Sequence, residues 1–409
     1  MEHPSETELM DFTKQKLLCG PNTLATNDRP GTLACLSVRF ALEFNADGLA
    51  RDVACSQVER HMRLYMTVTT SFEKLITLAG SEPLLAEAAY ELLKETLKNA
   101  VHHLAHHSGL NCIDRGRRGE VVAALIIMHA CDEARRATSA NRRWISVVDF
   151  MRDLPPPSEY ETLRKSRPTF SRAREDKPFE ETFQDYAMWF NHVIKIEDNK
   201  MISVDNLWKF VTRGAMILCS DNQDGIDIVL PLCDTKRKLS RDSVTAILIQ
   251  VRNSRRFKKD MQTTLFDAMS PFDLGMFLED GPSGTVNPKP VIRLVLALAS
   301  SEAGVVFRKG TVPKSHPDTF TAFDIWLAGL STATFRHIGE DLASYHILLE
   351  RSMRSHDELE LSDDPLMGQE LRKLKASRRQ RMAPLVSSRP GHGEIHGGDD
   401  SDWELIWAA

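Results

Sequence analysis

Two short apolar runs, joined by a charged connection, constrain this chain more than any other feature. They lie in GIDIVLPLCDTKRKLSRDSVTAILIQVRN, residues 225–253. Each run is short and rich in β-branched residues, which is typical of strands in a buried sheet. Yet the first run contains Asp227, and the second runs into Gln250, Arg252 and Asn253. A buried carboxylate is costly unless a partner neutralises it. The sequence therefore predicts a sheet with a polar site at one end of two neighbouring strands.

Further elements follow from periodicity and from start and stop signals. AMILCS (215–220) and VIRLVLALAS (291–300) are predicted as strands, and the apolar stretch 121–131 as a buried helix. The clearest helix is predicted in SEPLLAEAAYELLKETLKNAVHHLAHHSG, with Ser81 as its cap and Gly109 at its end. Four more segments are predicted as helices: PFEETFQDYAMWFNHVIKI, SVDNLWKFVTRG, FTAFDIWLAGL and EDLASYHILLERSMRS.

These elements predict three regions. Residues 1–110 are expected to be helical, with almost no strand signal. Residues 111–354 are expected to form an α/β core, a mixed central sheet flanked by helices, with a helical insertion at 150–210. Residues 355–409 are expected to be a largely disordered tail, because acidic, basic and Gly/Ser/Asp-rich stretches follow one another there.

Composition limits the classes of protein to consider. The chain has 409 residues and a net charge of −5, so any nucleic-acid-binding surface must be a local basic patch. No secretory signal and no apolar run of about 18 residues is visible, which predicts no membrane segment. The seven cysteines form no CxxC pair, which favours reduced thiols in an intracellular protein. The basic run in the tail, 372–381, is a candidate nuclear-import signal, so nucleus and cytoplasm are both open.

Four polar residues inside apolar elements form a candidate site. Glu120 stands at the entrance of the buried helix, Asp227 in the first apolar run, and Gln250 and Arg252 two residues apart on the next strand. Side chains two apart on a strand share a face. If the two strands are neighbours, carboxylate, amide and cation converge, and Glu120 approaches from the helix packed on that face. Hard oxygen ligands of this kind suit Mg²⁺ (or Mn²⁺), with Glu120, Asp227 and Gln250 as ligands.

Two groups of residues are candidates for nucleic-acid binding. The turn before the buried helix and the segment after the second strand supply them: Arg115, Arg117, Arg118, Asn253, Arg255, Arg256, Lys258 and Lys259. Clustered cations next to the site fit contacts with a phosphate backbone. Solvated charge and an exposed helix start explain the same residues equally simply. In the same way, Asp227 alone would fit a turn cap or a lysine pair, and Glu120 an ordinary first-turn carboxylate.

The order of these motifs resembles the restriction-endonuclease-like, or PD-(D/E)XK, nuclease superfamily. GRGE at a helix start, GIDIVLP on a strand and ILIQVRN on the next are also similar to a group of fungal proteins related to the nuclease-like part of Crinkler-type effectors. The nuclease motifs cover residues 119–253. The resemblance implies a restriction-endonuclease-like core and a metal-dependent nuclease acting on nucleic acid, DNA more than RNA. Glu120, Asp227, Gln250 and Arg252 then match the catalytic positions.

One departure from the superfamily pattern decides between two functions. Arg252 stands where the resemblance leads one to expect a catalytic lysine, and arginine stays protonated, so it cannot act as a base. It is still suited to bidentate phosphate contact. A catalytically inactive pseudonuclease, acting as a nucleic-acid-binding or protein-interaction module, is therefore the alternative. A third hypothesis is a scaffold without nucleic-acid contact, whose helical N-terminal region binds a protein partner.

Overall fold

The computed structural model describes most of the first 352 residues. The described ranges are 5–25, 28–44, 49–68, 75–94, 100–105, 118–137, 143–170, 177–220, 225–277, 289–308 and 320–352. The chain divides into two units, Met1–Met353 and Arg354–Ala409. The predicted tail, with the basic run at 372–381, lies outside the described residues, as do Arg115 and Arg117.

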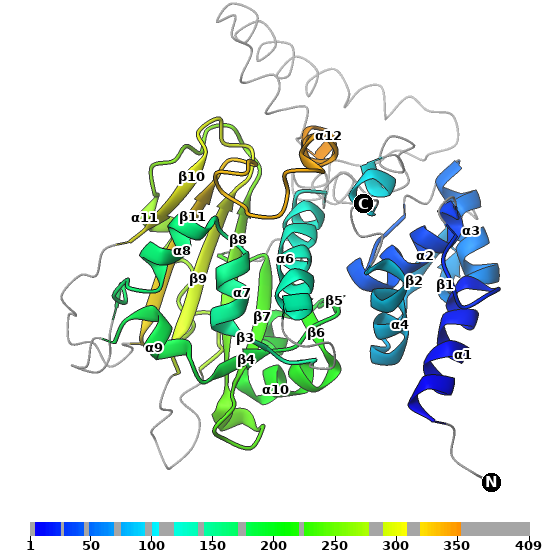
Figure 1. The fold of residues 1–409 in the computed structure, drawn as a ribbon, viewed down its shortest axis with the longest axis horizontal. Coiled ribbons are helices and arrows are strands. Elements are labelled where there is room, and N and C mark those ends of the chain that lie inside the picture. Colours follow the sequence, from blue (N-terminus) through cyan, green and yellow to red (C-terminus); the bar gives the residue numbers. More distant parts are fainter. Residues whose placement is uncertain are drawn as a thin grey trace, which may run out of the picture. The chain divides into compact units, whose positions relative to one another are not determined.

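A mixed sheet forms the centre of the first unit (Figure 1). Its strand order is β10-β11-β9-β8-β7-β4-β3, and β6 joins β7 to β5 off this path. The central pair β7 and β8 is antiparallel, whereas β9 runs parallel to both β8 and β11. The strands are β3 Ile145–Ser146, β4 Tyr186–Met188, β5 His192–Lys195, β6 Ala215–Leu218, β7 Ile228–Asp234, β8 Val244–Arg252, β9 Val291–Ala297, β10 Gly304–Phe307 and β11 Ala322–Ala328. The chain therefore has the mixed α/β architecture expected from its sequence.

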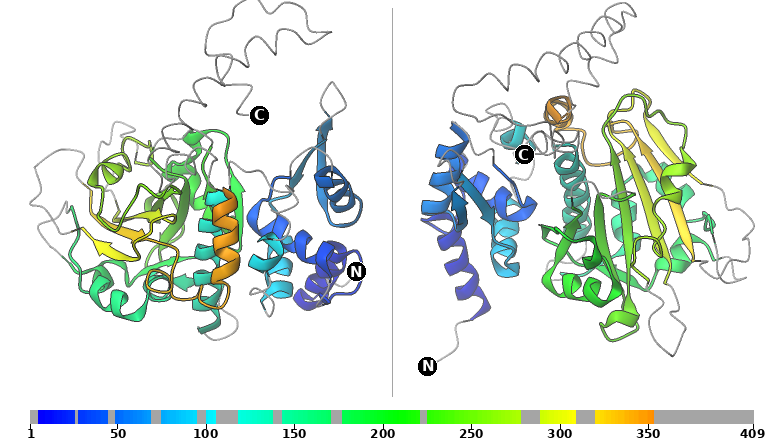
Figure 2. Two further views of the ribbon diagram at one scale, coloured as in Figure 1. Left: turned by 90° about the horizontal axis from the view of Figure 1, so that it is seen from above. Right: turned by 180° about the vertical axis from the view of Figure 1, so that it is seen from behind.

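Helices cover both faces of this sheet. The described helices are α1 Glu6–Leu18, α2 Arg29–Phe40, α3 Leu49–Arg60, α4 Pro83–Leu93, α6 Arg118–Ala137, α7 Val147–Asp153, α8 Pro157–Leu163, α9 Phe179–Phe183, α10 Val204–Arg213, α11 Thr263–Asp267 and α12 Leu342–Ser352, with short 3-10 turns η1 Asn199–Met201 and η2 Arg241–Ser243. One face packs against α6 to α9, with α12 alongside α6 (Figure 2), and the other against α10 and α11.

The strand alternation assigns each β8 residue to one of these faces. Ile247, Ile249 and Val251 pack with α6 in one apolar core, and Leu248 packs with α10 in the other. All of these side chains are buried, which is why the run reads as continuously apolar rather than alternating. The buried α6 and the strands β6 to β9 confirm the predictions made for those segments.

Three predictions of secondary structure and one of a helix cap were wrong. The N-terminal region contains a hairpin, β1 Arg63–Val68 and β2 Leu75–Ala79, where no strand was expected. The segment predicted as a helix at 178–196 contains only the short α9, followed by β4 and β5. FTAFDIWLAGL forms the buried strand β11 rather than a helix, because it lies between β9 and β10. The cap of α4 is Glu82, whose carboxylate accepts from the Leu85 N–H, and not Ser81.

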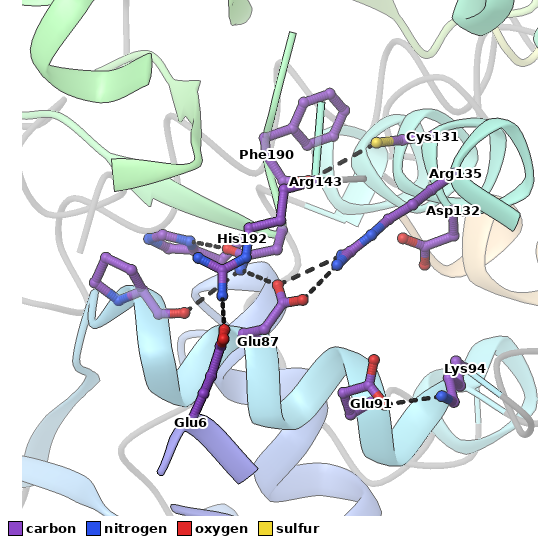
Figure 3. A network of polar contacts seen from close by, with 12 residues as sticks. Glu6, Glu87, Glu91, Lys94, Cys131, Asp132, Arg135, Arg143, Phe190 and His192 are labelled. Atoms are coloured by element: carbon purple, nitrogen blue, oxygen red, sulfur yellow. Dashed lines mark hydrogen bonds and ion pairs between the residues drawn. The ribbon is translucent and has the colours of Figure 1, made fainter. Parts of the chain in front are cut away.

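The N-terminal helices share one core with the sheet. Arg39 of α2 makes a bidentate pair with Asp132 of α6, at 2.8 and 2.9 Å, and donates to the Asn191 carbonyl before β5. Beside it, Glu87 of α4 accepts from Arg135 and from the Asn191 amide (Figure 3). The apolar core that contains α6 also includes side chains of α1, α2 and α4. The predicted helical region is thus packed into the same unit as the sheet.

Two smaller expectations concern the thiols and the membrane. The six described cysteines are free, as expected for reduced thiols, and Cys131, Cys219 and Cys233 are buried. None of the described helices is long and apolar enough to cross a lipid bilayer.

Candidate functional site

Asp227 sits immediately before β7, where the ladder of paired residues between β7 and β8 ends. Its N–H donates to the Ile249 carbonyl at 2.9 Å, and its carboxylate Oδ2 accepts from the Val251 N–H at 2.6 Å. The side chain thereby takes the place of a strand carbonyl. Burial raises the pKa of Asp227, while the Val251 hydrogen bond and the charge of Arg252 act in the opposite direction. The strand end therefore holds a carboxylate whose negative charge is only partly stabilised by the Val251 hydrogen bond and by Arg252.

Gly225 makes this approach to β7 possible. Its φ is +89°, and a Cβ built there would lie 2.2 Å from the Ala268 carbonyl oxygen. Both the left-handed backbone and the close contact require glycine. The glycine of the GID motif thus fixes the path of the chain two residues before Asp227.

Gln250 lies near the end of β8, two residues before Arg252. The residue is 2 % exposed, and its side-chain oxygen Oε1 is buried without a hydrogen-bond partner. Buried polar atoms are nearly always paired, so such an atom calls for an explanation, for example an ion that is not part of the structure. By strand alternation Gln250 belongs to the face of Leu248, which α10 and α11 cover.

Glu120 reaches the same end of the sheet from the first turn of α6. The preceding Gly119 is so close to β8 that a Cβ there would lie 3.2 Å from the Asn253 side-chain nitrogen. One expectation is corrected here. The helix α6 packs on the face opposite to Gln250, so Glu120 comes to the site past the strand end and not across the face. The close packing of Gly119 against Asn253 determines this position of Glu120.

Cys219 is the residue that the sequence pattern did not reveal at this site. It follows β6, and its N–H donates to the Asp227 carbonyl at 2.9 Å. Burial raises the pKa of the Cys219 thiol, and the negative charges of Asp227 and Glu120 raise it further. Both carboxylates therefore lie near one thiol. A cysteine in the apolar run AMILCS gives no signal other than its place at a strand end.

The segment after β8 displays the basic residues. Arg255, Arg256, Lys258 and Lys259 are exposed, whereas Phe257 between them is buried and fixes the turn in the core. Residues 253–262 are irregular, with a turn at 255–256, and α11 begins only at Thr263, so the alternative of an exposed helix start is wrong.

The remaining predicted binding residues lie at or just before the start of α6 in the sequence and directly after β8. Arg118 is the first residue of α6, and its side chain lies outside the described residues, together with all of Arg115 and Arg117. Asn253 and Arg252 are half-buried. The structure therefore brings Glu120, Asp227, Gln250 and Arg252 to one end of the sheet, with the cations 255–259 directly after it.

The donor set at this strand end is compatible with a hard cation. Two carboxylates and an amide oxygen are the ligand types that Mg²⁺ and Mn²⁺ use. Among the described residues, no group of three His, Cys, Asp or Glu side chains is arranged to hold a metal ion. The candidate site contains Glu120, Asp227 and Cys219, which do not form such a group, and the orphaned Gln250 oxygen adds an amide oxygen at the same strand end.

A second buried charge cluster lies on the other half of the sheet. Arg293 of β9 makes a bidentate pair with Asp324 of β11, at 2.6 and 2.7 Å, and donates to the Phe266 carbonyl at 2.6 Å. Arg308 adds a contact to the same carboxylate at 3.3 Å. Each strand carries one charged residue in an apolar run, a signal that was visible in the sequence. Because these groups satisfy one another, the cluster is structural.

Comparison with known proteins identifies the family. A family model described as a domain of unknown function, DUF8736, matches residues 27–294, well over half of the chain. The chain therefore belongs to this family. The match includes all four site residues and ends within β9. No curated protein and no solved structure matches the chain.

Proposed function

We propose that this member of the DUF8736 family is a divalent-metal-dependent nucleic-acid phosphodiesterase. Its site comprises Glu120, Asp227, Gln250 and Arg252. The observation that carries the proposal is the buried Gln250 oxygen without a partner, at the same strand end as the half-buried Asp227 carboxylate, whose pKa is raised. Both groups would be stabilised by one cation, and neither is explained by packing alone.

The roles follow from the chemistry of the side chains. Asp227, Glu120 and Gln250 supply oxygen ligands for Mg²⁺ or Mn²⁺; because the Val251 N–H occupies Oδ2 of Asp227, Oδ1 is the oxygen left for the metal. Such an ion supplies Lewis-acid stabilisation of a phosphate and a more acidic bound water. Arg252, charged at every relevant pH, binds the scissile phosphate, and the cations 255–259 bind the adjoining backbone. DNA is the first substrate to test, followed by RNA.

The test is a cleavage assay with three forms of the full chain. Wild type, Asp227→Asn and the control Asp260→Asn, an exposed carboxylate after the basic segment, are incubated with plasmid DNA, single-stranded DNA and RNA in Mg²⁺ or Mn²⁺. We expect cleavage by wild type and by the control, and a loss of at least about a hundredfold in Asp227→Asn, since removing a metal ligand removes the ion's contribution to catalysis. Equal cleavage by wild type and Asp227→Asn would exclude Asp227 from the site.

The second candidate is an inactive pseudonuclease that binds nucleic acid, and the identity of Arg252 favours it. An arginine cannot release a proton to act as a base, whereas a lysine at the same place can. The variant Arg252→Lys separates the two candidates. Metal-dependent cleavage that appears only in this variant identifies the natural chain as a degenerate enzyme. Absence of cleavage in both, with salt-dependent binding of DNA or RNA retained, identifies a binding module.

A further inference from the structure

A hollow lies at the N-terminal end of the fold, away from the candidate site. It has a volume of about 590 Å³ and is lined by residues of three elements that lie next to one another in Figure 1: the end of α1, the end of α3 and the start of β1. The two helix ends are joined directly, because the His61 ring contacts the Leu17 carbonyl at 3.0 Å. The volume is within the range of sites that bind small molecules or peptide side chains.

Large apolar side chains are exposed at this hollow. Phe12, Met62 and Leu64 line it and are 55 %, 49 % and 49 % exposed. Tyr65 and Met66 continue the exposed row along β1, at 53 % and 54 %. Three successive apolar residues exposed on one strand are unusual on a monomer surface, and contiguous patches of this kind mark interaction sites. In the described chain β1 has a single strand neighbour, β2.

The backbone around the hollow is also unusual. Of the three described non-glycine residues with positive φ, two line it: Cys19 at +52° and Met62 at +58°. Non-glycine residues in this conformation are strained, and they cluster where a ligand is held. Cys19 terminates α1, a common place for such a cap. Met62 lies between α3 and β1, where it turns the chain and leaves its side chain exposed.

The charges around the hollow are mainly positive. Lys16, Arg60 and Arg63 line it, against the single carboxylate of Glu59. Each of the two helix C-termini contributes roughly half a negative charge, so the two ends offset about one cation and Glu59 offsets another. The balance is a positive charge of about one, next to exposed apolar groups.

Arg63 is the buried member of these three cations, and the negative charge of Glu43 partly offsets the effect of its burial. It is 4 % exposed, and it donates to the Thr77 hydroxyl, the Thr77 carbonyl and the Leu42 carbonyl, all of them neutral. Its Nη1 is buried without a hydrogen-bond partner, and the guanidinium lies 4.1 Å from the centre of the Phe44 ring. Burial lowers the pKa of Arg63 to about 10. A buried cation of this kind is stabilised by an incoming anion.

We infer that this hollow is a docking site for an acidic peptide segment of a partner protein, with bulky apolar side chains on either side of a carboxylate. The apolar side chains pack on Phe12, Met62 and Leu64, and the carboxylate lies beside Lys16, Arg60 and Arg63. Electrostatic complementarity selects an acidic partner, whereas a second copy of this chain would bring the same cations together. The inference is independent of the nuclease proposal, because the two surfaces share no residue.

The test is selection of random 12-residue peptides displayed on phage against the full chain. The wild type is compared with Phe12→Ser/Leu64→Ser, with Lys16→Glu/Arg60→Glu, and with the control Ile347→Ser, which changes an exposed apolar residue on α12. The substituted residues are partly or largely exposed, so the variants are expected to fold, and circular dichroism checks this. Selected peptides are then synthesised with a fluorophore, and their dissociation constants are measured by fluorescence polarisation.

We expect the selected peptides to contain Asp or Glu between large apolar residues. Their affinity should fall at least about tenfold in both surface variants, remain unchanged in Ile347→Ser, and weaken with salt because exposed charges are screened. Selection of basic peptides, or equal affinity for all four proteins, would overturn the inference. A concentration-dependent dimer that Phe12→Ser/Leu64→Ser abolishes would also overturn it, since the occupant would then be a second copy.

Discussion

At the scale of single residues, two opposing effects act on the Asp227 carboxyl. Burial favours its neutral form, whereas a bound cation would favour its ionised form. Burial raises its pKa above the ordinary value, so the folded chain holds the proton more tightly than the unfolded chain. Its contribution to stability is therefore present below the unfolded pKa and is lost as pH rises through the folded pKa. At neutral pH the ionised carboxylate destabilises the metal-free fold, and a bound cation would offset this.

Asp227→Asn tests that conclusion without an activity assay. The amide oxygen can still accept from the Val251 N–H, while the negative charge of the half-buried side chain is removed. We expect the Tm at pH 7 in EDTA to rise by roughly 2 °C, the shift that about 1 kcal/mol produces in a large chain. The difference from wild type should shrink as pH falls through the folded pKa. Scanning fluorimetry from pH 4 to pH 8 measures it.

Metal addition supplies the second half of the measurement. Mn²⁺ should raise the Tm of wild type, because a ligand that binds only the folded state stabilises it, and should leave Asp227→Asn unchanged. Asp260→Asn serves again as the control and should follow wild type. A lower Tm for Asp227→Asn at pH 7 would show that the carboxylate is a purely structural acceptor.

The residues of the candidate site differ in how far the sequence revealed them. Asp227 and Gln250 were visible because polar groups interrupt apolar strands. Cys219 was not visible, because cysteine is among the residues most often buried and does not stand out in an apolar run. That Glu120 reaches the strand end past Asn253, rather than across the face, depends on how closely Gly119 packs. Such a contact joins residues more than a hundred positions apart, and no local pattern encodes it.

At the scale of elements, Gly225 controls how β7 enters the sheet. In Gly225→Ala the left-handed backbone costs roughly 1–2 kcal/mol, and the new methyl group meets the Ala268 carbonyl oxygen. We expect the free energy of unfolding to fall by about 3 kcal/mol in urea titrations, with weaker Mn²⁺ binding because Asp227 is displaced. Gly20→Ala is the matched control, since its nearest contact is at 3.9 Å. Equal stability of the two variants would show that the turn relaxes freely.

The two segments that were predicted as helices and form strands share a physical cause. The segment FTAFDIWLAGL and the stretch around Tyr186 to Met188 are short, apolar and buried on both sides, so their periodicity does not separate strand from helix. Strand pairing decides the matter, and β11 pairs with β9 and β10, while β4 pairs with β7 and β3. The central strands were predicted correctly because β-branched residues dominate them and charged turns bound them.

At the scale of the whole molecule, a buried ion pair holds the N-terminal helices to the sheet. Arg39 and Asp132 are almost fully buried and paired through two hydrogen bonds, and Arg39 also donates to the Asn191 carbonyl. Removing one partner leaves an uncompensated buried charge, which typically costs about 3–5 kcal/mol. We therefore expect Arg39→Met and Asp132→Leu each to destabilise the chain by that amount, and the double variant to be more stable than either.

Urea unfolding followed by two probes measures these energies and also tests the shared core. Trp144 and Trp189 flank β3 and β4, Trp208 lies in α10 and Trp326 in β11, whereas residues 1–110 contain no tryptophan. The other two tryptophans, Trp403 and Trp407, lie outside the described residues. With Trp403→Phe/Trp407→Phe as the common background, tryptophan fluorescence therefore follows the sheet, and far-ultraviolet circular dichroism follows all helices. Because one apolar core joins Leu17 of α1 to Leu349 of α12, both probes should show a single coincident transition. Two separate transitions, or a double variant as unstable as the single ones, would mean that the N-terminal helices form an independent domain.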